Sequence, residues 1–223
     1  MSHYVKFTYQ RARADIAPFE AIAELNACRR KLLEQRLIGL DANGIGFGNL
    51  SVRDGASGNF YITGSATGGL LELTPTDCVR VVAYDFAKNW LRYEGAAIPS
   101  SESLTHAAIY ESDPTISAVI HCHDSVLWRT LLDRVPTSSK AIAYGTPEMA
   151  DEIMRLFKGT DVPSRKILAM AGHEGGIVTF GKNLEVAFDV LMRARELPRP
   201  CENGRQYAGH SGQNARAPRQ ITE

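Results

Sequence analysis

The sequence predicts a layered α/β domain whose sheet is at least partly antiparallel. Amphipathic helical segments alternate with short apolar strand segments along the chain, and several strands follow one another across short turns, as in hairpins. The 223 residues are 44% hydrophobic, which is enough for one sizeable core. We therefore expect a single domain over residues 1–197, followed by a loose polar arm over residues 198–223.

The charge balance and the cysteines exclude several classes of protein. The chain has 25 Lys and Arg against 25 Asp and Glu, so no global field favours nucleic acid or an anionic membrane as a partner. No stretch approaches the roughly 20 apolar residues of a membrane helix, and residues 1–13 lack the apolar core of a signal peptide. The four scattered cysteines fit a reducing compartment. We expect a cytoplasmic protein that binds a small molecule.

The N-terminal half begins with an amphipathic helix. Apolar residues recur at spacings of three and four over residues 19–37, and Gly39 is expected to end the helix. Residues 41–48 are a glycine-rich loop. Strands are expected over residues 50–53, 60–62, 78–84 and 90–93, with a turn over 85–89 joining the last two.

In the C-terminal half, helices and strands alternate. Ser101 is expected to cap a helix that ends near Ser112 before Pro114. Pro147 fits the first turn of a later helix, and Asn183 is expected to cap the last one. Helices are expected over residues 125–132, 146–159 and 183–196, and strands over 116–123, 166–170 and 176–180.

His121 and His123 form the most informative motif of the chain, because they end the apolar strand over residues 116–120. Two imidazoles one residue apart on a strand point to the same face, so both can reach one ion. The alternative is a pair of hydrogen-bonded histidines. His173, after a second apolar strand, and Glu102, at an expected helix start, are further ligand candidates. This set suits zinc, manganese, iron or cobalt, whereas Cys122 should point away into the core.

Two nucleotide-binding motifs are incomplete. Residues 44–49 begin like a dinucleotide fingerprint, but Asn49 stands where the third glycine belongs and a strand follows. Residues 64–69 have the spacing of a phosphate loop, yet Leu70 replaces the lysine. What remains is two loops of small residues, 48–51 and 63–69, whose amides and hydroxyls could surround an oxyanion. The alternative is that both are ordinary turns.

Taken in order, several short motifs resemble the class II aldolase/adducin family over about residues 19–195. They are Gly48-Asn49-Leu50-Ser51, Ile62-Thr63-Gly64-Ser65, Pro99-Ser100-Ser101-Glu102, His106, His121-Cys122-His123 and His173. The resemblance implies a three-layer α/β/α fold with a mixed, mostly antiparallel sheet. It also implies a homotetramer with active sites between subunits.

The resemblance further implies the role of each site residue. His121, His123 and His173 would bind one divalent ion per subunit, with Zn²⁺ expected and Mn²⁺ or Co²⁺ as alternatives. Glu102 would bind the ion without substrate and act as an acid or base with substrate. The substrate phosphate would be held by Asn49, Thr63, Gly64, Ser100 and Ser101.

The chain departs from the family pattern in two places. His173 is followed by Glu174 and only then by Gly175, whereas the family more often has histidine followed directly by glycine. The loop after His173 therefore carries one extra residue. The segment before Gly145 is short compared with the fuculose-phosphate aldolases, and Tyr144 is no clear match for the tyrosine found there. Tyr207 and His210 could reach a neighbouring subunit's site, or the arm could have no function.

We therefore expect a divalent-metal lyase of the class II aldolase type, acting on a small sugar phosphate or related hydroxy-carbonyl compound. Cleavage would leave an enediolate whose charge rests on oxygens bound to the metal, while Glu102 moves a proton at the neighbouring carbon. A dehydratase or decarboxylase could use the same site. A glutamate at this position argues against the family's epimerases, which typically carry aspartate. A non-catalytic, adducin-like binding module is the alternative of another class.

Overall fold

A computed structural model of the chain describes residues 6–16 and 19–197. Its central sheet has eight strands in the order β1-β7-β6-β5-β4-β8-β10-β9. β1 pairs with β7 in parallel, and every other neighbouring pair is antiparallel. The strands are β1 (Thr8–Arg13), β4 (Asn49–Arg53), β5 (Phe60–Thr63), β6 (Cys78–Asp85), β7 (Trp90–Glu94), β8 (Ala118–His123), β9 (Ile167–Ala169) and β10 (Gly176–Gly181). The predicted mixed, mostly antiparallel sheet is confirmed.

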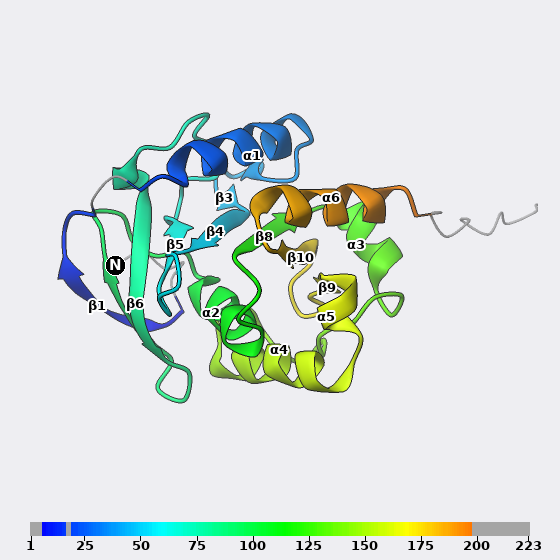
Figure 1. The fold of residues 1–223 in the computed structure, drawn as a ribbon. Coiled ribbons are helices and arrows are strands. Elements are labelled where there is room, and N and C mark those ends of the chain that lie inside the picture. Colours follow the sequence, from blue (N-terminus) through cyan, green and yellow to red (C-terminus); the bar gives the residue numbers. More distant parts are fainter. Residues whose placement is uncertain (1–5, 17–18, 198–223) are drawn as a thin grey trace, which may run out of the picture.

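Helices lie on both faces of this sheet (Figure 1). α1 and α6 run along one face, where they share an apolar cluster with the sheet, and α2 and α4 contribute to a second cluster on the opposite face. The helices are α1 (Ile22–Glu34), α2 (Ser103–Ser112), α3 (Ser125–Leu131), α4 (Pro147–Gly159), α5 (Val162–Arg165) and α6 (Leu184–Arg195), with a short 3₁₀ helix, η1, at Pro75–Asp77.

Strand β8 separates these two clusters residue by residue. Ile120 and Cys122 are fully buried in the cluster that contains α1 and α6, whereas Val119 is buried in the cluster that contains α2 and α4. Because side chains alternate along a strand, His121 and His123 share the face of Val119. The prediction that Cys122 points away from the two histidines is confirmed.

Most predicted helix ends are confirmed, but the start of α2 and the end of α1 differ from the prediction. The Asn183 side chain accepts a hydrogen bond from the Val186 N–H at 2.9 Å, and Pro147 begins α4. Ser101 does not cap α2, because Glu102 occupies the N-cap position and the helix starts at Ser103. The Ser103 hydroxyl instead donates to the Ser100 carbonyl at 2.7 Å, which closes a tight turn before the helix.

Five elements were not predicted: β1, β2, β3, η1 and α5. All six residues of β1 are exposed, so its sequence shows no apolar alternation. The expected loop after Gly39 contains a two-stranded hairpin of β2 (Gly39–Leu40) and β3 (Gly46–Phe47). α5 has only four residues. In addition, α1 ends at Glu34, earlier than expected, and Arg36 has a left-handed backbone conformation with φ 56°.

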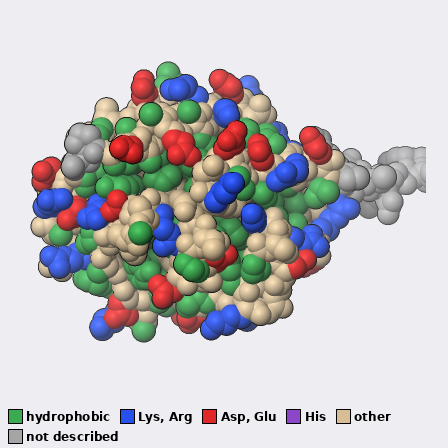
Figure 2. All heavy atoms as spheres, viewed as in Figure 1, with side chains coloured by type: hydrophobic (Ala, Val, Ile, Leu, Met, Phe, Trp, Pro, Cys, Tyr) green, Lys and Arg blue, Asp and Glu red, His purple; other side chains and the backbone are tan. Residues whose placement is uncertain are grey.

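The surface agrees with the balanced composition. Acidic and basic side chains are interspersed on the face shown in Figure 2. Among residues 6–16 and 19–197, the helices are too short or too polar to cross a membrane. The predicted arm over residues 198–223, with Tyr207 and His210, lies outside the described residues.

The loop over residues 64–71 is held from two sides. The fully buried Arg29 of α1 donates from Nη2 to the carbonyl oxygens of Thr67 at 3.0 Å and Leu70 at 2.7 Å. On the other side, the loop packs directly on the β2–β3 hairpin. A Cβ atom added at Gly68 would lie 2.9 Å from the Phe47 backbone nitrogen and would overlap the Gly39 carbonyl oxygen.

Gly68→Ala should therefore destabilise the protein by about 2 kcal/mol, because a methyl group cannot fit between two backbones without moving one of them. Gly58→Ala is the matched control, since a Cβ atom there meets nothing within 4 Å. Urea unfolding of both variants measures the difference. Equal stability of the two variants would show that the loop moves freely away from the hairpin.

Candidate metal centre

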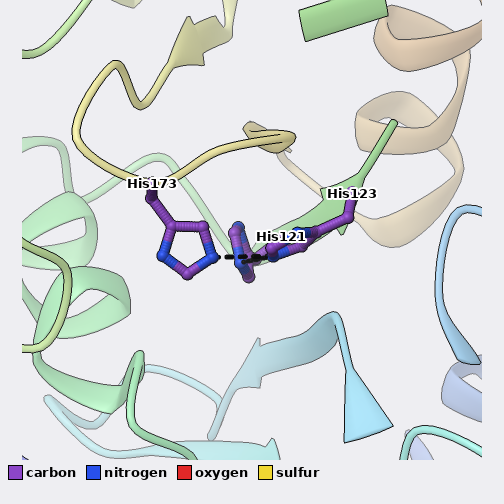
Figure 3. A group of neighbouring side chains, drawn as sticks. All are labelled: His121, His123 and His173. Carbon is purple, nitrogen blue, oxygen red and sulfur yellow. Dashed lines mark hydrogen bonds between the residues drawn. The ribbon is translucent and has the colours of Figure 1, made fainter. Parts of the chain in front are cut away.

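Three imidazole rings point toward one another on one side of the sheet (Figure 3). His121 and His123 come from β8, and His173 comes from the loop between β9 and β10. The His123 Nε2 atom lies 3.0 Å from His121 Nε2 and 2.8 Å from His173 Nε2. These three side chains offer ligand atoms that all lie within 4.8 Å of one another, so one ion could contact all three.

The loop that departs from the family pattern still brings His173 to the other two histidines. Gly176 begins β10 directly opposite His123, and its N–H donates to the His173 carbonyl at 2.8 Å. Gly175 has a φ of +79°, which glycine adopts without strain. The two residues after His173 thus form a tight turn between β9 and β10, and the imidazole is not displaced.

Burial keeps the three imidazoles neutral. It lowers the pKa of His121 well below its usual value, with smaller effects from His123 and His173. It also lowers the pKa of His123 to about 4 and that of His173 to about 3. A neutral imidazole has one unprotonated nitrogen, which is the form that binds a metal. Three such nitrogens at one point are therefore a suitable ligand set for zinc or a related ion.

The Glu102 carboxylate is buried beside this cluster. The residue is only 3% exposed, and neither carboxylate oxygen has a partner among the described residues. Its Oε1 atom lies 3.8 Å from Nδ1 of His173, so it is next to that ring rather than among the three converging Nε2 atoms. Burial raises the pKa of Glu102 to about 7, against smaller lowering effects of Thr105 and Lys6. A buried carboxylate without a partner fits the presence of a cation.

The histidines and Glu102 open into a cavity of about 580 Å³. Four of the five residues expected to hold a phosphate also line it: Asn49, Gly64, Ser100 and Ser101. Asn49 does so because β4 pairs it directly with His121. Thr63 does not line the cavity, since it is fully buried and its hydroxyl accepts a 3.3 Å hydrogen bond from the Leu50 N–H.

His106, which is part of the family-like pattern, lies outside the metal cluster. Its Nδ1 atom lies 2.7 Å from the Ser51 hydroxyl, which is also 2.7 Å from the Tyr110 hydroxyl. Burial lowers the pKa of His106 to about 3, so the ring is neutral. This buried chain of hydrogen bonds connects α2, which begins after Glu102, to the strand that carries Asn49.

Two residues near the site were missed or left without a role by sequence reasoning. Tyr144 lines the cavity, and its ring centroid lies 4.1 Å from that of His173. Lys6 places its Nζ atom 3.4 Å from the centre of the Tyr144 ring. Tyr144 lies close to a glycine turn in the sequence, which gave a weak signal. Lys6 gave none, because it is one basic residue in a polar N-terminal segment.

Comparison with known proteins identifies the family. Residues 27–199 match the model of the Class II Aldolase and Adducin N-terminal domain family, and the chain therefore belongs to this family. It is 30% identical over 169 residues to the methylthioribulose-1-phosphate dehydratase of Leptospira biflexa serovar Patoc, covering 63% of this chain and 78% of that protein.

Solved structures agree with this assignment. An L-fuculose 1-phosphate aldolase is similar at 26% identity with a TM-score of 0.62, covering 81% of this chain and 84% of that one. The L-fuculose-1-phosphate aldolase from Thermus thermophilus has the same fold at 21% identity and a TM-score of 0.56, covering 78% of this chain and 89% of that one. The predictions of the family and of a class II aldolase-like enzyme are confirmed.

Glu102→Gln should make the metal-free protein more stable at alkaline pH. At pH 8 the folded wild type must hold a buried carboxylate, whereas the amide is neutral. Since the folded pKa of about 7 exceeds the ordinary 4.5, the wild type regains this stability by taking up a proton as the pH falls from 7 to 4.5. The gain of the variant should be about 3 kcal/mol at pH 8 and should vanish near pH 4.5.

Urea unfolding of the chelator-treated proteins at pH 4.5, 6 and 8 measures this difference. Glu148→Gln, an exposed position on α4, is the matched control for the same chemical change. The histidines titrate in wild type and in Glu102→Gln alike, so their contribution to the pH dependence cancels in the difference between the two proteins. A difference that stays constant from pH 4.5 to 8 would contradict a raised pKa at Glu102.

Proposed function

We propose that the protein is a divalent-metal lyase, specifically an aldolase that cleaves a small sugar phosphate or a related hydroxy-carbonyl compound. The observation that carries this proposal is the convergence of three neutral imidazoles beside a buried, unpartnered carboxylate, in a cavity lined by small polar residues. Similarity to L-fuculose 1-phosphate aldolase supports the choice of reaction.

His121, His123 and His173 would hold the ion, which we propose to be Zn²⁺, with Mn²⁺ or Co²⁺ as alternatives. Glu102 would supply the fourth ligand in the absence of substrate. A bound divalent ion supplies Lewis acidity beside a substrate carbonyl. The neutral state of the three imidazoles means that they need not lose protons to bind it near pH 7.

Glu102 would be the residue that moves the proton. Its pKa of about 7 lets the carboxyl group both accept and donate a proton near neutral pH. Glu102 is only 3% exposed and lines the cavity, so it would be placed to exchange a proton with a substrate bound there. In this proposal Glu102 acts at the carbon next to the substrate carbonyl.

The phosphate of the substrate would lie against the small polar residues of the cavity. Asn49, Ser100 and Ser101 carry neutral amide and hydroxyl donors, whereas Gly64 lines the cavity without a side chain and its N–H donates to the Asp77 carbonyl at 2.8 Å. Thr63 would then act indirectly, because its hydroxyl holds the strand that carries Asn49.

A dehydratase is the second candidate, favoured by the 30% identity to a methylthioribulose-1-phosphate dehydratase. The same acid/base residue could expel a hydroxyl group as water instead of breaking a carbon–carbon bond. A decarboxylase on the same site belongs to the same alternative. NMR of the products distinguishes the three reactions, because only an aldolase yields two carbonyl fragments.

We further propose the larger assembly that the family resemblance implies. It is a cytoplasmic homotetramer with active sites between subunits, built from a three-layer α/β/α domain over residues 1–197 with an arm over 198–223. The size of the particle in solution, measured by light scattering, tests the tetramer.

Removal of the metal should abolish turnover, and re-addition of Zn²⁺, Mn²⁺ or Co²⁺ should restore it. His121→Ala should lower the bound metal measured by elemental analysis, because two imidazoles bind a divalent ion much more weakly than three. Unchanged turnover in the stripped protein or in His121→Ala would show that the reaction needs no ion at this site.

Glu102→Gln should retain the bound metal and the fold but lower kcat by about 100-fold or more, because the amide cannot exchange a proton. Glu148→Gln is the control and should keep full activity. Elemental analysis, circular dichroism and a screen of phosphorylated and free ketoses provide the measurements. Full activity of Glu102→Gln would remove this residue from the mechanism.

A further inference from the structure

Lys6 is held at a fixed place by the residues around it. The next residue, Phe7, is 6% exposed and belongs to the apolar cluster that contains α2 and α4. The Lys6 carbonyl accepts a 2.8 Å hydrogen bond from the Asn89 side chain, and the Thr8 N–H donates to the Asn89 carbonyl at 2.9 Å. Lys6 precedes the family-matched segment 27–199, so its position is a feature of this chain beyond the matched domain.

The Lys6 side chain lies against the outside of the cavity wall. Its Nζ atom is 3.4 Å from the centre of the Tyr144 ring, and Tyr144 lines the cavity beside His173. A Cβ atom added at Gly145 would lie 3.2 Å from both the Lys6 Cβ and the Ser101 carbonyl oxygen. The stem of Lys6 therefore lies next to Gly145, which also adjoins the Ser101 carbonyl, and its ammonium group lies over the Tyr144 ring.

The cavity itself lacks a positive charge. Its charged lining residues are Asp41 and Glu102, and no Lys or Arg is among the described residues that line it. Lys6 is exposed and forms no salt bridge with a carboxylate within residues 6–16 and 19–197. It is thus a cation beside an acidic cavity, with its charge available to a ligand.

We propose that Lys6 is a substrate-binding residue that attracts an oxyanion, phosphate or carboxylate, to the edge of the cavity formed by Ser101 and Tyr144. An exposed cation–π contact is weak, so the ammonium can leave the Tyr144 ring for a charge-assisted hydrogen bond. The flexible four-carbon stem permits this movement. The inference rests on the proposed function only in requiring an anionic substrate.

Lys6→Gln should raise KM for the phosphorylated substrate by about ten-fold with a smaller change in kcat, because the attraction of the anion is lost whereas Lys6 has the smallest of the effects on the pKa of Glu102. Lys6→Arg should restore KM, since the charge is kept. The KM of the wild type should rise with salt more steeply than that of Lys6→Gln. Lys158→Gln, an exposed lysine of α4, is the matched control and should leave KM unchanged.

Calorimetric titration of inorganic phosphate and of acetate into the metal-loaded proteins tests the same inference without turnover. Either anion can also bind to the metal ion, but this contribution should be the same in wild type and in Lys6→Gln. The difference between their affinities therefore measures the contribution of Lys6. Weaker phosphate binding in Lys6→Gln supports a phosphate site, and weaker acetate binding alone supports a carboxylate site.

Equal affinities in wild type and Lys6→Gln for both anions, or no binding of either anion to the wild type, would overturn the inference. Failure to find any sugar-phosphate substrate would instead count against the proposed function, while the titrations would still decide the role of Lys6. Thermal unfolding of the variants, expected to match wild type, excludes a change in folding.

Discussion

The alternation of side chains along β8 is the constraint on which the candidate site depends. Ile120 and Cys122 are fully buried in the cluster that contains α1 and α6. His121 and His123 must therefore point to the opposite face of the sheet. β8 lies between β4 and β10, and both neighbours fix its register. If β8 slipped by one residue, the imidazoles would be buried in the apolar cluster of α1 and α6. The aliphatic side chains of β8 would then face the cavity. The packing of the core therefore sets the geometry of the candidate metal centre.

The same burial has opposite effects on the two kinds of site residue. Desolvation disfavours the charged form of any group, so it lowers the pKa of the histidines and raises that of Glu102. Neutral imidazoles are ready to bind a cation, and a carboxyl group with a pKa near 7 is ready to exchange a proton. A single property, the burial of these side chains, thus prepares both the proposed ligands and the proposed acid/base residue.

Sequence reasoning succeeded where burial leaves a periodic pattern and failed where it does not. The strand leading to His121 is visible because both of its faces are buried, so its residues form an apolar run, whereas β1 is exposed along its whole length and carries no such pattern. Lys6 was missed for the same reason. The N-cap of α2 was misplaced by one residue, because Ser100, Ser101 and Ser103 are all good cap residues and only the three-dimensional turn decides where the helix begins.

The loop after His173 shows how a departure in sequence can leave a site intact. The extra residue is taken up in a tight turn at Gly175, so Gly176 stays opposite His123 and His173 still reaches the other imidazoles. Tyr144 packs on the His173 ring and Lys6 packs on Tyr144 at the neighbouring part of the cavity. Both departures from the family pattern, the loop after His173 and the segment before Gly145, therefore lie at this part of the cavity. If this part of the cavity selects the substrate, members of the family can share one ligand set and still accept different sugar phosphates.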